Sequence, residues 1–419
     1  MTNNWPIIVH WFYRDPSGLI GYLLLCMSSK TLDFNNTEIA FRDKTDAELR
    51  QRHILFRTLN SQSLVDFGAH SASWALKLGL PIKPLIKATV FKYFCGGESL
   101  EECEPVVRRL GESGIGTILD YAIEGKEDER DFDATCSEVV KNIERARSNP
   151  DIPFAVFKVT GVARFMLLEK VSSEIELTPS EQDEFERVRK RVEKICQKGA
   201  EMGQPVLIDA EESWIQDAID GLAEEMMSRH NREEVIVYHT VQLYRKDRLS
   251  YLKDSFERIR SGGSKYGVKL VRGAYLEKER DRATRLGYPS PVHDRLEDTA
   301  RDFDAAVDFC LARRGELGFV AATHNERATQ VLVGKMRASN ISNDDSSVHF
   351  SQLFGMSDNL SYVLASEGYN VSKYLPYGPV EDAIPYLTRR ARENSSVRGQ
   401  ASRELTLIER ELERRKRER

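Results

Sequence analysis

The sequence predicts an α/β protein whose main domain is a closed (β/α)8 barrel of the TIM type, preceded by an N-terminal helical region. From Gly116 onward, eight short apolar runs alternate with longer segments of helical apolar spacing, which is the pattern of parallel βα units. A doubly wound open sheet would also alternate, but no G-x-G-x-x-G motif follows the first run. The eight runs are Gly116–Ala122, Phe154–Thr160, Pro205–Asp209, Val235–Gln242, Val268–Val271, Phe319–Thr323, Val348–Leu353 and Val371–Leu375.

The chain before the first run has helical patterns and no strand signal. Helical apolar spacing is present in Ala47–Leu59, Leu64–Leu78, Leu85–Phe94 and Glu101–Leu110. We therefore divide the chain into an N-terminal extension (1–34), an N-terminal helical region (35–112), the barrel (113–400) and a charged C-terminal helix (401–419). Because that last helix carries many charges of both signs, we expect it to be solvated.

The composition describes a soluble globular protein. Hydrophobic residues make up 41% and charged residues 30% of the 419 positions, and the net charge of -5 argues against a nucleic-acid surface. The six cysteines are scattered without a CxxC pair. This usage is typical of a reducing compartment and argues against a structural zinc site.

The N-terminus carries a nine-residue apolar run, Leu19–Met27, which is too short to span a bilayer. It lacks a basic n-region and an A-x-A cleavage site, and no transit peptide is evident. Our hypothesis is that residues 1–26 are an upstream extension outside the fold.

Polar side chains follow the predicted strands at the end where a barrel of this type places its site. Because such ends converge on one mouth, we expect a ligand site there. The acids Asp209, Glu211 and Glu212 could be a metal cluster, but no metal-ligand spacing supports it, so no metal is predicted. The residues at the strand ends include Asp120, Lys158, Asp209, Gln242, Lys269, Arg272, His324, Asn325, Gln352 and Tyr374.

Two cations lie in the fifth run. Lys269 and Arg272 are three positions apart, so a strand would place them on opposite faces and bury at least one of them. A buried lysine, Lys158 or Lys269, could form a Schiff base, which keeps a lyase or aldolase barrel open as an alternative. No Ser or Cys lies in a nucleophile-elbow context.

The segment after the last run is the most unusual stretch of the chain. Tyr386, Arg389, Arg390 and Glu393 share one helical face. A guanidinium pair beside an aromatic ring is suited to hold a carboxylate by parallel hydrogen bonds. The alternative is a solvated helix whose arginines pair with Glu393 and other acids.

Four motifs together resemble the proline dehydrogenase family. They are Lys-Leu-Val-Arg-Gly-Ala-Tyr (269–275), Ile-Asp-Ala-Glu-Glu (208–212), Thr-His-Asn (323–325) and Tyr-x-x-Arg-Arg-x-x-Glu-Asn (386–394), and the resemblance runs from about residue 35 to 400. It implies a distorted (β/α)8 barrel that binds FAD without a Rossmann motif. It also implies oxidation of L-proline to Δ1-pyrroline-5-carboxylate, with electrons passed to a membrane quinone.

The resemblance also implies roles for individual residues. Arg389 and Arg390 would clamp the proline carboxylate with Lys158 assisting, and Glu393 would brace an arginine. The pocket would be lined by Asp209, Tyr275, Leu353, Tyr374 and Tyr386. The flavin would be held by Gln242, Lys269, Arg272, Gly273, Ala274, Thr323, His324, Asn325 and Gln352. Some family members have Arg first and Lys fourth in the fifth-strand motif, so the sequence leaves open whether Lys269 or Arg272 reaches the flavin N5 edge.

The family further implies a cytoplasmic protein in peripheral contact with the inner face of the membrane, or a mitochondrial one in a eukaryote. Tyr374 would occupy the space near C4 of proline, which predicts weak use of 4-hydroxyproline. Besides the lyase, a non-catalytic metabolite-binding barrel is a third interpretation, which the charged strand ends argue against.

Overall fold

The computed structural model describes residues 31–61, 81–123, 126–396 and 400–419, and it leaves the side chains of 391–401 undescribed. Three interpretations therefore fall outside the described residues: the extension at 1–26, the apolar run at 19–27 and the helix at 64–78. The role predicted for the Glu393 side chain also lies outside them.

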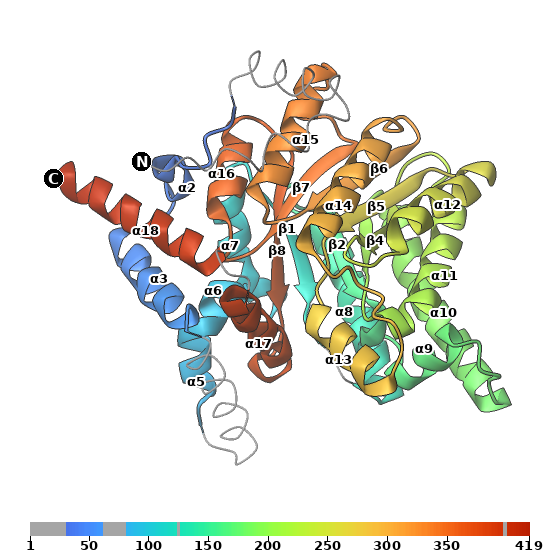
Figure 1. Cartoon of the computed structure of the whole chain (residues 1–419). Helices are drawn as coiled ribbons and strands as arrows, with labels where there is room; N and C mark the ends of the chain where they lie inside the picture. Colours follow the sequence, from blue (N-terminus) through green and yellow to red (C-terminus); the bar gives the residue numbers. More distant parts are fainter. Residues whose placement is uncertain (1–30, 62–80, 124–125, 397–399) are drawn as a thin grey trace.

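Eight parallel strands close into a barrel in which each strand pairs with the next along the chain and β8 pairs with β1 (Figure 1). The predicted (β/α)8 barrel is confirmed, and each predicted apolar run overlaps one strand, although β5 and β6 begin two residues before their runs and β8 ends two residues after its run. The strands are β1 Gly116–Tyr121, β2 Phe154–Lys158, β3 Val206–Asp209, β4 Val237–Gln242, β5 Tyr266–Val271, β6 Leu317–Ala322, β7 Val348–Leu353 and β8 Val371–Tyr377.

Helices surround the barrel and precede it. Before β1 lie α2 Thr37–Ala40, α3 Asp46–Leu59, α5 Lys83–Ile86, the π-helical turn η1 Lys87–Phe91, α6 Lys92–Phe94 and α7 Leu100–Gly111. Between the strands lie α8 Glu129–Arg147, the 3-10 turn η2 Val159–Gly161, α9 Phe165–Ser172, α10 Pro179–Met202, α11 Ser213–His230, α12 Arg248–Ser261, α13 Leu276–Leu286, α14 Leu296–Leu311, α15 Glu326–Ala338 and α16 Asp358–Ser366. After β8 come α17 Val380–Ser396 and α18 Gln400–Arg417.

Local sequence signals set the helix ends. In α10, Thr178 forms a capping box with Glu181, Pro179 occupies the first turn, and Gly203 ends the helix in a left-handed conformation at φ +62°. A second capping box, between Thr45 and Glu48, begins α3. These caps satisfy backbone groups that the helix itself leaves unpaired.

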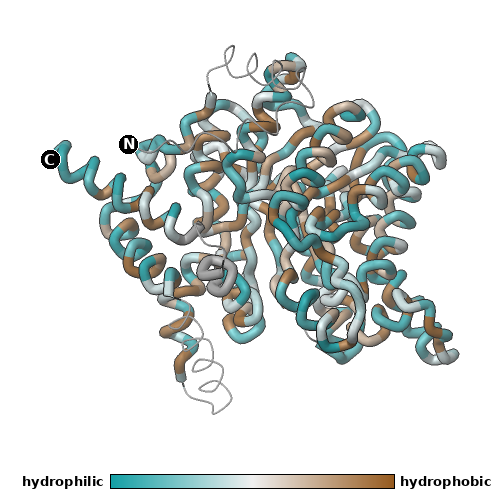
Figure 2. Tube along the Cα trace, in the orientation of Figure 1, coloured by the Kyte–Doolittle hydropathy of each residue, from teal (hydrophilic) through white to brown (hydrophobic). Residues whose placement is uncertain are grey.

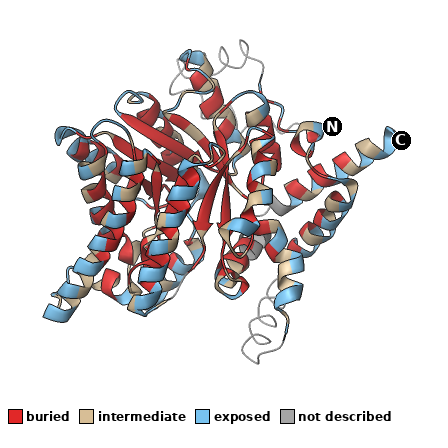
Figure 3. Cartoon of the chain, turned by 180° about the vertical axis from the view of Figure 1, so that it is seen from behind, coloured by how far each residue is buried: buried red, intermediate tan, exposed pale blue. Residues whose placement is uncertain are grey.

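The strands are the most deeply buried layer of the molecule, as Figure 3 shows. Inside the barrel, near the amino ends of the strands, the Phe154 ring packs edge-on against Tyr238 and His349. Gly318 makes room for this packing, because a Cβ there would lie 2.6 Å from the Tyr238 hydroxyl oxygen. Aromatic side chains therefore fill this part of the interior, and a ligand has to enter at the other end.

The expectation that the C-terminal helix is solvated is wrong. Helix α18 packs against α3 and α2, and Leu407 and Ile408 are buried with Phe41, Leu49 and Phe56. Figure 2 shows the reason, since hydrophobic positions recur along an otherwise hydrophilic helix. A narrow apolar stripe is enough to dock a helix when a complementary surface exists elsewhere in the chain.

Candidate active site

Five inward-facing side chains meet at the carboxyl ends of the strands, and we call them the mouth cluster: Asp120, Lys158, Asp209, Lys269 and Tyr374. Lys158 Nζ lies 3.2 Å from Asp120 Oδ2, 3.3 Å from Asp209 Oδ2 and 3.1 Å from the Tyr374 hydroxyl. The Tyr374 hydroxyl donates to Asp209 Oδ2 at 2.7 Å. Lys269 pairs with the other Asp209 oxygen. The network holds every member in a fixed orientation.

The two carboxyl groups of the mouth cluster differ in their electrostatics. Burial opposes ionisation of Asp209, but the charges of Lys269 and Lys158 outweigh it and lower its pKa to about 2. For Asp120 burial dominates and raises the pKa above its usual range, although Lys158 opposes this. Asp209 is therefore the permanent negative charge of the mouth, and Asp120 is the group whose protonation responds to its surroundings.

Helix α17 follows β8 and reaches across the mouth. It begins at Val380 and continues through Pro385. The Arg389 guanidinium lies over the Tyr275 ring at 5.8 Å, and the Arg390 guanidinium over the Tyr386 ring at 5.3 Å. Since Tyr275 follows β5, this contact joins opposite sides of the barrel, and Figure 1 shows α17 beside α13. Arg390 is buried and not solvated. The alternative in which the arginines pair with Glu393 falls outside the described side chains.

The base of α17 rests on the N-terminal helices. Val380, Ala383 and Leu387 form one apolar cluster with Phe91 and Phe94. Leu353 at the end of β7 packs against the same cluster, and against the one inside the barrel. The N-terminal helical region thus sets the position of the helix that carries the two arginines.

A second part of the mouth is built from the ends of β4 and β5. Gln242 Nε2 donates to the Glu211 carbonyl at 2.7 Å, and Gln242 Oε1 accepts from the Ala274 N–H at 3.0 Å. Gly273 adopts φ +143°, and a Cβ there would lie 2.3 Å from the Tyr244 ring. The glycine is therefore required for the chain to turn this closely over the tyrosine.

Lys269 and Arg272 point in different directions, as their spacing predicts. Lys269 lies at the barrel axis in the mouth cluster, whereas Arg272 follows the strand and stacks on Phe303 of α14 at 5.4 Å. Among the described residues, Arg272 Nε and Nη2 have no hydrogen-bond partner although both atoms are buried. Burial lowers the pKa of this guanidinium. Such donors fit an anionic ligand group.

The predicted cofactor residues of β6 and β7 are also linked to one another. Gln352 Nε2 donates to the Thr323 carbonyl at 3.2 Å. His324 Nδ1 lies 2.9 Å from the Ser357 hydroxyl, and burial with the charges of Lys373 and Arg390 lowers the pKa of His324 to about 3. The imidazole is therefore neutral. Asn325 caps α15 by accepting the Ala328 N–H at 2.8 Å, so its Oδ1 is already engaged.

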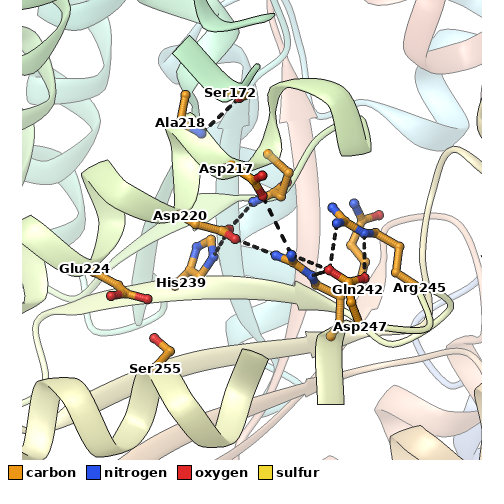
Figure 4. Close-up of polar contacts among 12 residues, drawn as sticks. Ser172, Asp217, Ala218, Asp220, Glu224, His239, Gln242, Arg245, Asp247 and Ser255 are labelled. Atoms are coloured by element: carbon orange, nitrogen blue, oxygen red, sulfur yellow. Dashed lines mark hydrogen bonds and ion pairs between the residues drawn. The ribbon is translucent and has the colours of Figure 1, made fainter. Parts of the chain in front are cut away.

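A buried polar network behind β4 supports the floor of this region (Figure 4). Asp220 of α11 accepts from Gln216 at 2.8 Å and lies 2.8 Å from His239 Nε2 and 2.5 Å from Arg248 Nη1. The Gln216 oxygen accepts the Glu211 N–H at 2.8 Å. Because Gln242 holds the Glu211 carbonyl, the network reaches from the helices outside the barrel to the mouth.

The structure brings three further residues to this region that sequence reasoning did not include among the catalytic or cofactor residues. Asp120 ends β1 and completes the mouth cluster. Glu211 is buried, accepts from Thr160, and has a pKa raised to about 8 by burial and the neighbouring Glu212. Ser357 contacts His324 from the turn after β7. The sequence held a signal for two of them, since Asp120 is a polar residue at the end of the first run and Glu211 belongs to the acidic group after the third.

No group of His, Cys, Asp and Glu in the described ranges is arranged to hold a metal ion. Nor does any helix in those ranges combine the length and the hydropathy that crossing a bilayer requires.

The proline dehydrogenase family model matches residues 103–403, which is most of the chain. The chain belongs to the proline dehydrogenase family. This family of oxidoreductases includes relatives that match almost the whole chain. "Proline dehydrogenase 1, mitochondrial" of Dictyostelium discoideum is 31% identical over 93% of this chain and 76% of its own length.

Other relatives have different names. "Hydroxyproline dehydrogenase" of Xenopus laevis is 31% identical over 90% of this chain and 88% of its own length. "Carbapenem antibiotics biosynthesis protein CarD" of Pectobacterium carotovorum subsp. carotovorum is 33% identical over 77% of this chain and 83% of its own length. The relatives agree in family, but their names differ in whether the substrate is proline or hydroxyproline.

The chain is also similar in fold to solved structures of proline utilization A. Proline utilization A from Bdellovibrio bacteriovorus, inactivated by N-propargylglycine, superposes with a TM-score of 0.68 at 19% identity. The match covers 90% of this chain and 41% of that protein, so the present chain spans less than half of its length. The likeness supports the barrel fold of this family member.

Proposed function

We propose that the protein oxidises L-proline to Δ1-pyrroline-5-carboxylate with FAD as cofactor and passes the electrons to a membrane quinone. The observation that carries the proposal is the position of Arg389 and Arg390, which lie on a helix across the barrel mouth above a fixed cluster of charged side chains. Family membership supplies the reaction class.

Substrate binding follows from charge and shape. The proline carboxylate would be held by Arg389 and Arg390, since guanidinium groups bind carboxylates by paired hydrogen bonds. The ring would pack against Tyr275, Tyr374 and Leu353, while Asp209 would stabilise the adjacent cationic groups. A small zwitterion held at both ends has its C5 hydrogen aimed in one direction, which provides most of what hydride transfer requires from a protein.

The described residues fit FAD. The buried unpaired nitrogens of Arg272 suit an anionic part of the cofactor. The glycine at 273 lets the chain turn closely over the Tyr244 ring just after this arginine. When bound, FAD would supply N5 as the hydride acceptor. Lys269, at the barrel axis beside Tyr374, is the better placed of the two cations to face the reacting ring, and Arg272 would hold a more distant group. Gln242, Ala274, Thr323, His324, Asn325 and Gln352 would complete the cofactor site.

The lyase alternative fits less well. Lys158 and Lys269 are both ion-paired with carboxylates. A lysine that forms a Schiff base is instead activated by an apolar pocket or a neighbouring cation.

We also propose a location for the protein. It would lie in the cytoplasm with peripheral contact with the inner face of the membrane, or in a mitochondrion in a eukaryote.

An absorption spectrum of the purified protein tests the proposal directly. We expect flavin bands that bleach on anaerobic addition of L-proline and return when a soluble quinone is added. A colourless protein that borohydride traps covalently with substrate would instead establish the lyase.

The carboxylate anchor has its own test in Arg390→Met. Loss of one guanidinium should raise KM for proline by about 100-fold, because a charge-assisted bidentate contact contributes about 3 kcal/mol. Arg258→Met, which removes an exposed pair with Glu224 on the barrel exterior, is the matched control. An unchanged KM for Arg390→Met would show that the arginine is wrongly assigned.

A further inference from the structure

The turn between β7 and α16 is held by three helices that belong to distant parts of the chain. The turn comprises residues 354–357, and it lies next to the His324 imidazole. The turn itself meets α6 and α18, and Asp358, the residue that follows it and begins α16, pairs with α3. Because nothing in the barrel itself requires these contacts, their concentration on one turn calls for a physical reason.

Ser357 is the centre of this arrangement. It adopts φ +50°, a left-handed conformation that a residue with a side chain rarely takes. Its hydroxyl lies 2.9 Å from His324 Nδ1, and its backbone N–H donates to Glu404 of α18. A strained residue persists only when its surroundings determine it, and here the carboxyl of Glu404 provides one of those fixed contacts.

The rest of the turn is fixed from two further directions. The Met356 carbonyl accepts from Lys373 Nζ at 2.5 Å. Asp358, the first residue of α16, pairs with Lys373 at 2.8 Å and with Arg52 of α3 at 2.8 Å. Gly355 adopts φ +79°, and a Cβ there would lie 2.1 Å from the Tyr93 carbonyl oxygen. The turn therefore has one conformation available while α3, α6 and α18 are docked.

Glu404 is built into this site. The residue is 3% exposed, whereas its neighbour Arg403 pairs with Glu326 of α15 nearer the surface. A buried carboxyl group is costly unless it accepts a hydrogen bond, and the Ser357 N–H supplies one. An acid that only kept the helix soluble would lie on its exposed face. The burial of Glu404 therefore indicates that it serves a specific contact.

We propose that α18 belongs functionally to the flavin half of the active site, with Glu404 as a positioning residue that orients His324 through Ser357. The inference rests on the proposed FAD chemistry. Because Ser357 engages Nδ1, a flavin contact by His324 would use Nε2, and the ring orientation decides whether Nε2 meets it. The C-terminal helix thereby acts on the cofactor without touching it.

The test compares two variants at one position. Glu404→Leu removes the acceptor, whereas Glu404→Gln keeps an acceptor oxygen for the Ser357 N–H. Titration of apoprotein should show FAD binding weakened by about tenfold in E404L, the size of one lost hydrogen bond, and little changed in E404Q. KM for proline should be unchanged in both, because Arg389 and Arg390 are untouched.

Glu411→Leu is the matched control on the same helix. Glu411 is fully buried and pairs with Arg414 and Arg415, but it has no contact with the turn. This variant should lower Tm and leave FAD affinity as in the wild type. Equal weakening in E411L and E404L, or wild-type affinity in E404L, would overturn the inference.

Two measurements keep the test decisive. If E404L does not fold, Ser357→Ala retains the backbone bond to Glu404 and removes the hydroxyl at His324, and it should weaken FAD binding by a similar factor. An unchanged affinity in S357A would refute the proposal.

If the wild type binds no FAD, the proposed function fails instead. The ring resonances of His324 in histidine-labelled protein then decide, since they should shift in E404L and stay in place in E411L.

Discussion

Two buried ionic clusters lie on opposite sides of strand β8, and consecutive residues supply one member to each. Tyr374 points into the barrel and joins the mouth cluster. Lys373 points outward and joins what we call the terminal-helix cluster: Lys44, Arg52, Asp358, Lys373 and Glu404. The pleat of the strand alone separates them.

The clusters use the same residue types for different purposes. The Lys158 side chain keeps 14% exposure at the mouth, where ligand and water can exchange, whereas Lys373 has none. An ion pair sealed from water is costly to break, since one partner is left uncompensated, while a pair at an open mouth can be rehydrated. The exposure of each cluster to water, and not the residue types in it, therefore decides whether it stabilises the fold or can bind a ligand.

Breaking the terminal-helix cluster should have the largest effect. Asp358→Ala leaves Lys373 and Arg52 without their shared carboxylate, and we expect the free energy of unfolding to fall by about 3–5 kcal/mol. Urea denaturation measures this. A loss below about 1 kcal/mol would show that the cluster is hydrated and that the contrast with the mouth is unfounded.

The matched change at the mouth is Asp209→Asn. It removes the carboxylate shared by Lys158 and Lys269, and misplacement of these groups should lower kcat/KM for proline by about 100-fold. The stability loss should be smaller than in Asp358→Ala, because Lys158 keeps Asp120 and water can enter. Steady-state kinetics and denaturation of one preparation give both numbers. The reverse order of the two stability losses would contradict the comparison.

Glu211 should make the free energy of unfolding depend on pH. Its folded-state pKa is raised to about 8 by burial, so the folded protein holds a proton that the unfolded chain releases near pH 4.5. This contribution to stability is therefore fully present at low pH and is lost as pH rises toward 8, by up to about 1.4 kcal/mol per pH unit. Glu211→Gln should flatten that slope, which unfolding midpoints measured across the range would show.

The smallest effect is expected on the exposed side of the α3–α18 contact. His53 Nε2 lies 3.1 Å from Glu409, whose side chain is 53% exposed. Glu409→Ala should change the free energy of unfolding by less than about 0.5 kcal/mol, because exposed ion pairs contribute little. A thermal scan with the wild type in parallel is sufficient, and a larger shift would mean that charge, not apolar contact, docks α18.

Much of the candidate site could be predicted because each predicted strand ends in polar or charged residues. Lys158, Asp209, Lys269 and Tyr374 were each assigned from their place after or within an apolar run, and the barrel brings them within hydrogen-bond distance. Local periodicity carries this information. The contact between the Arg389 guanidinium and the Tyr275 ring was not predicted, although the motifs singled out both residues.

Other residues left no local signal. Ser357 and Glu404 are 47 positions apart, and both occur in segments whose composition suggests a plain turn and a solvated helix. The docking of α18 joins its narrow apolar stripe to a complementary apolar surface of α3, and residues 401–419 by themselves do not reveal that this surface exists. Long-range complementarity of this kind is fixed only when both surfaces exist.

The sequence by itself determined the closed barrel, the end of it at which the candidate site lies, and the family, because strand periodicity, polar strand ends and motif order are local properties. Only the tertiary structure decided which carboxylate serves which lysine, that Lys373 and Tyr374 enter separate clusters, and that the C-terminal helix reaches the turn beside His324. Those outcomes depend on burial and on contacts between distant segments, and their free energies arise only in the packed molecule.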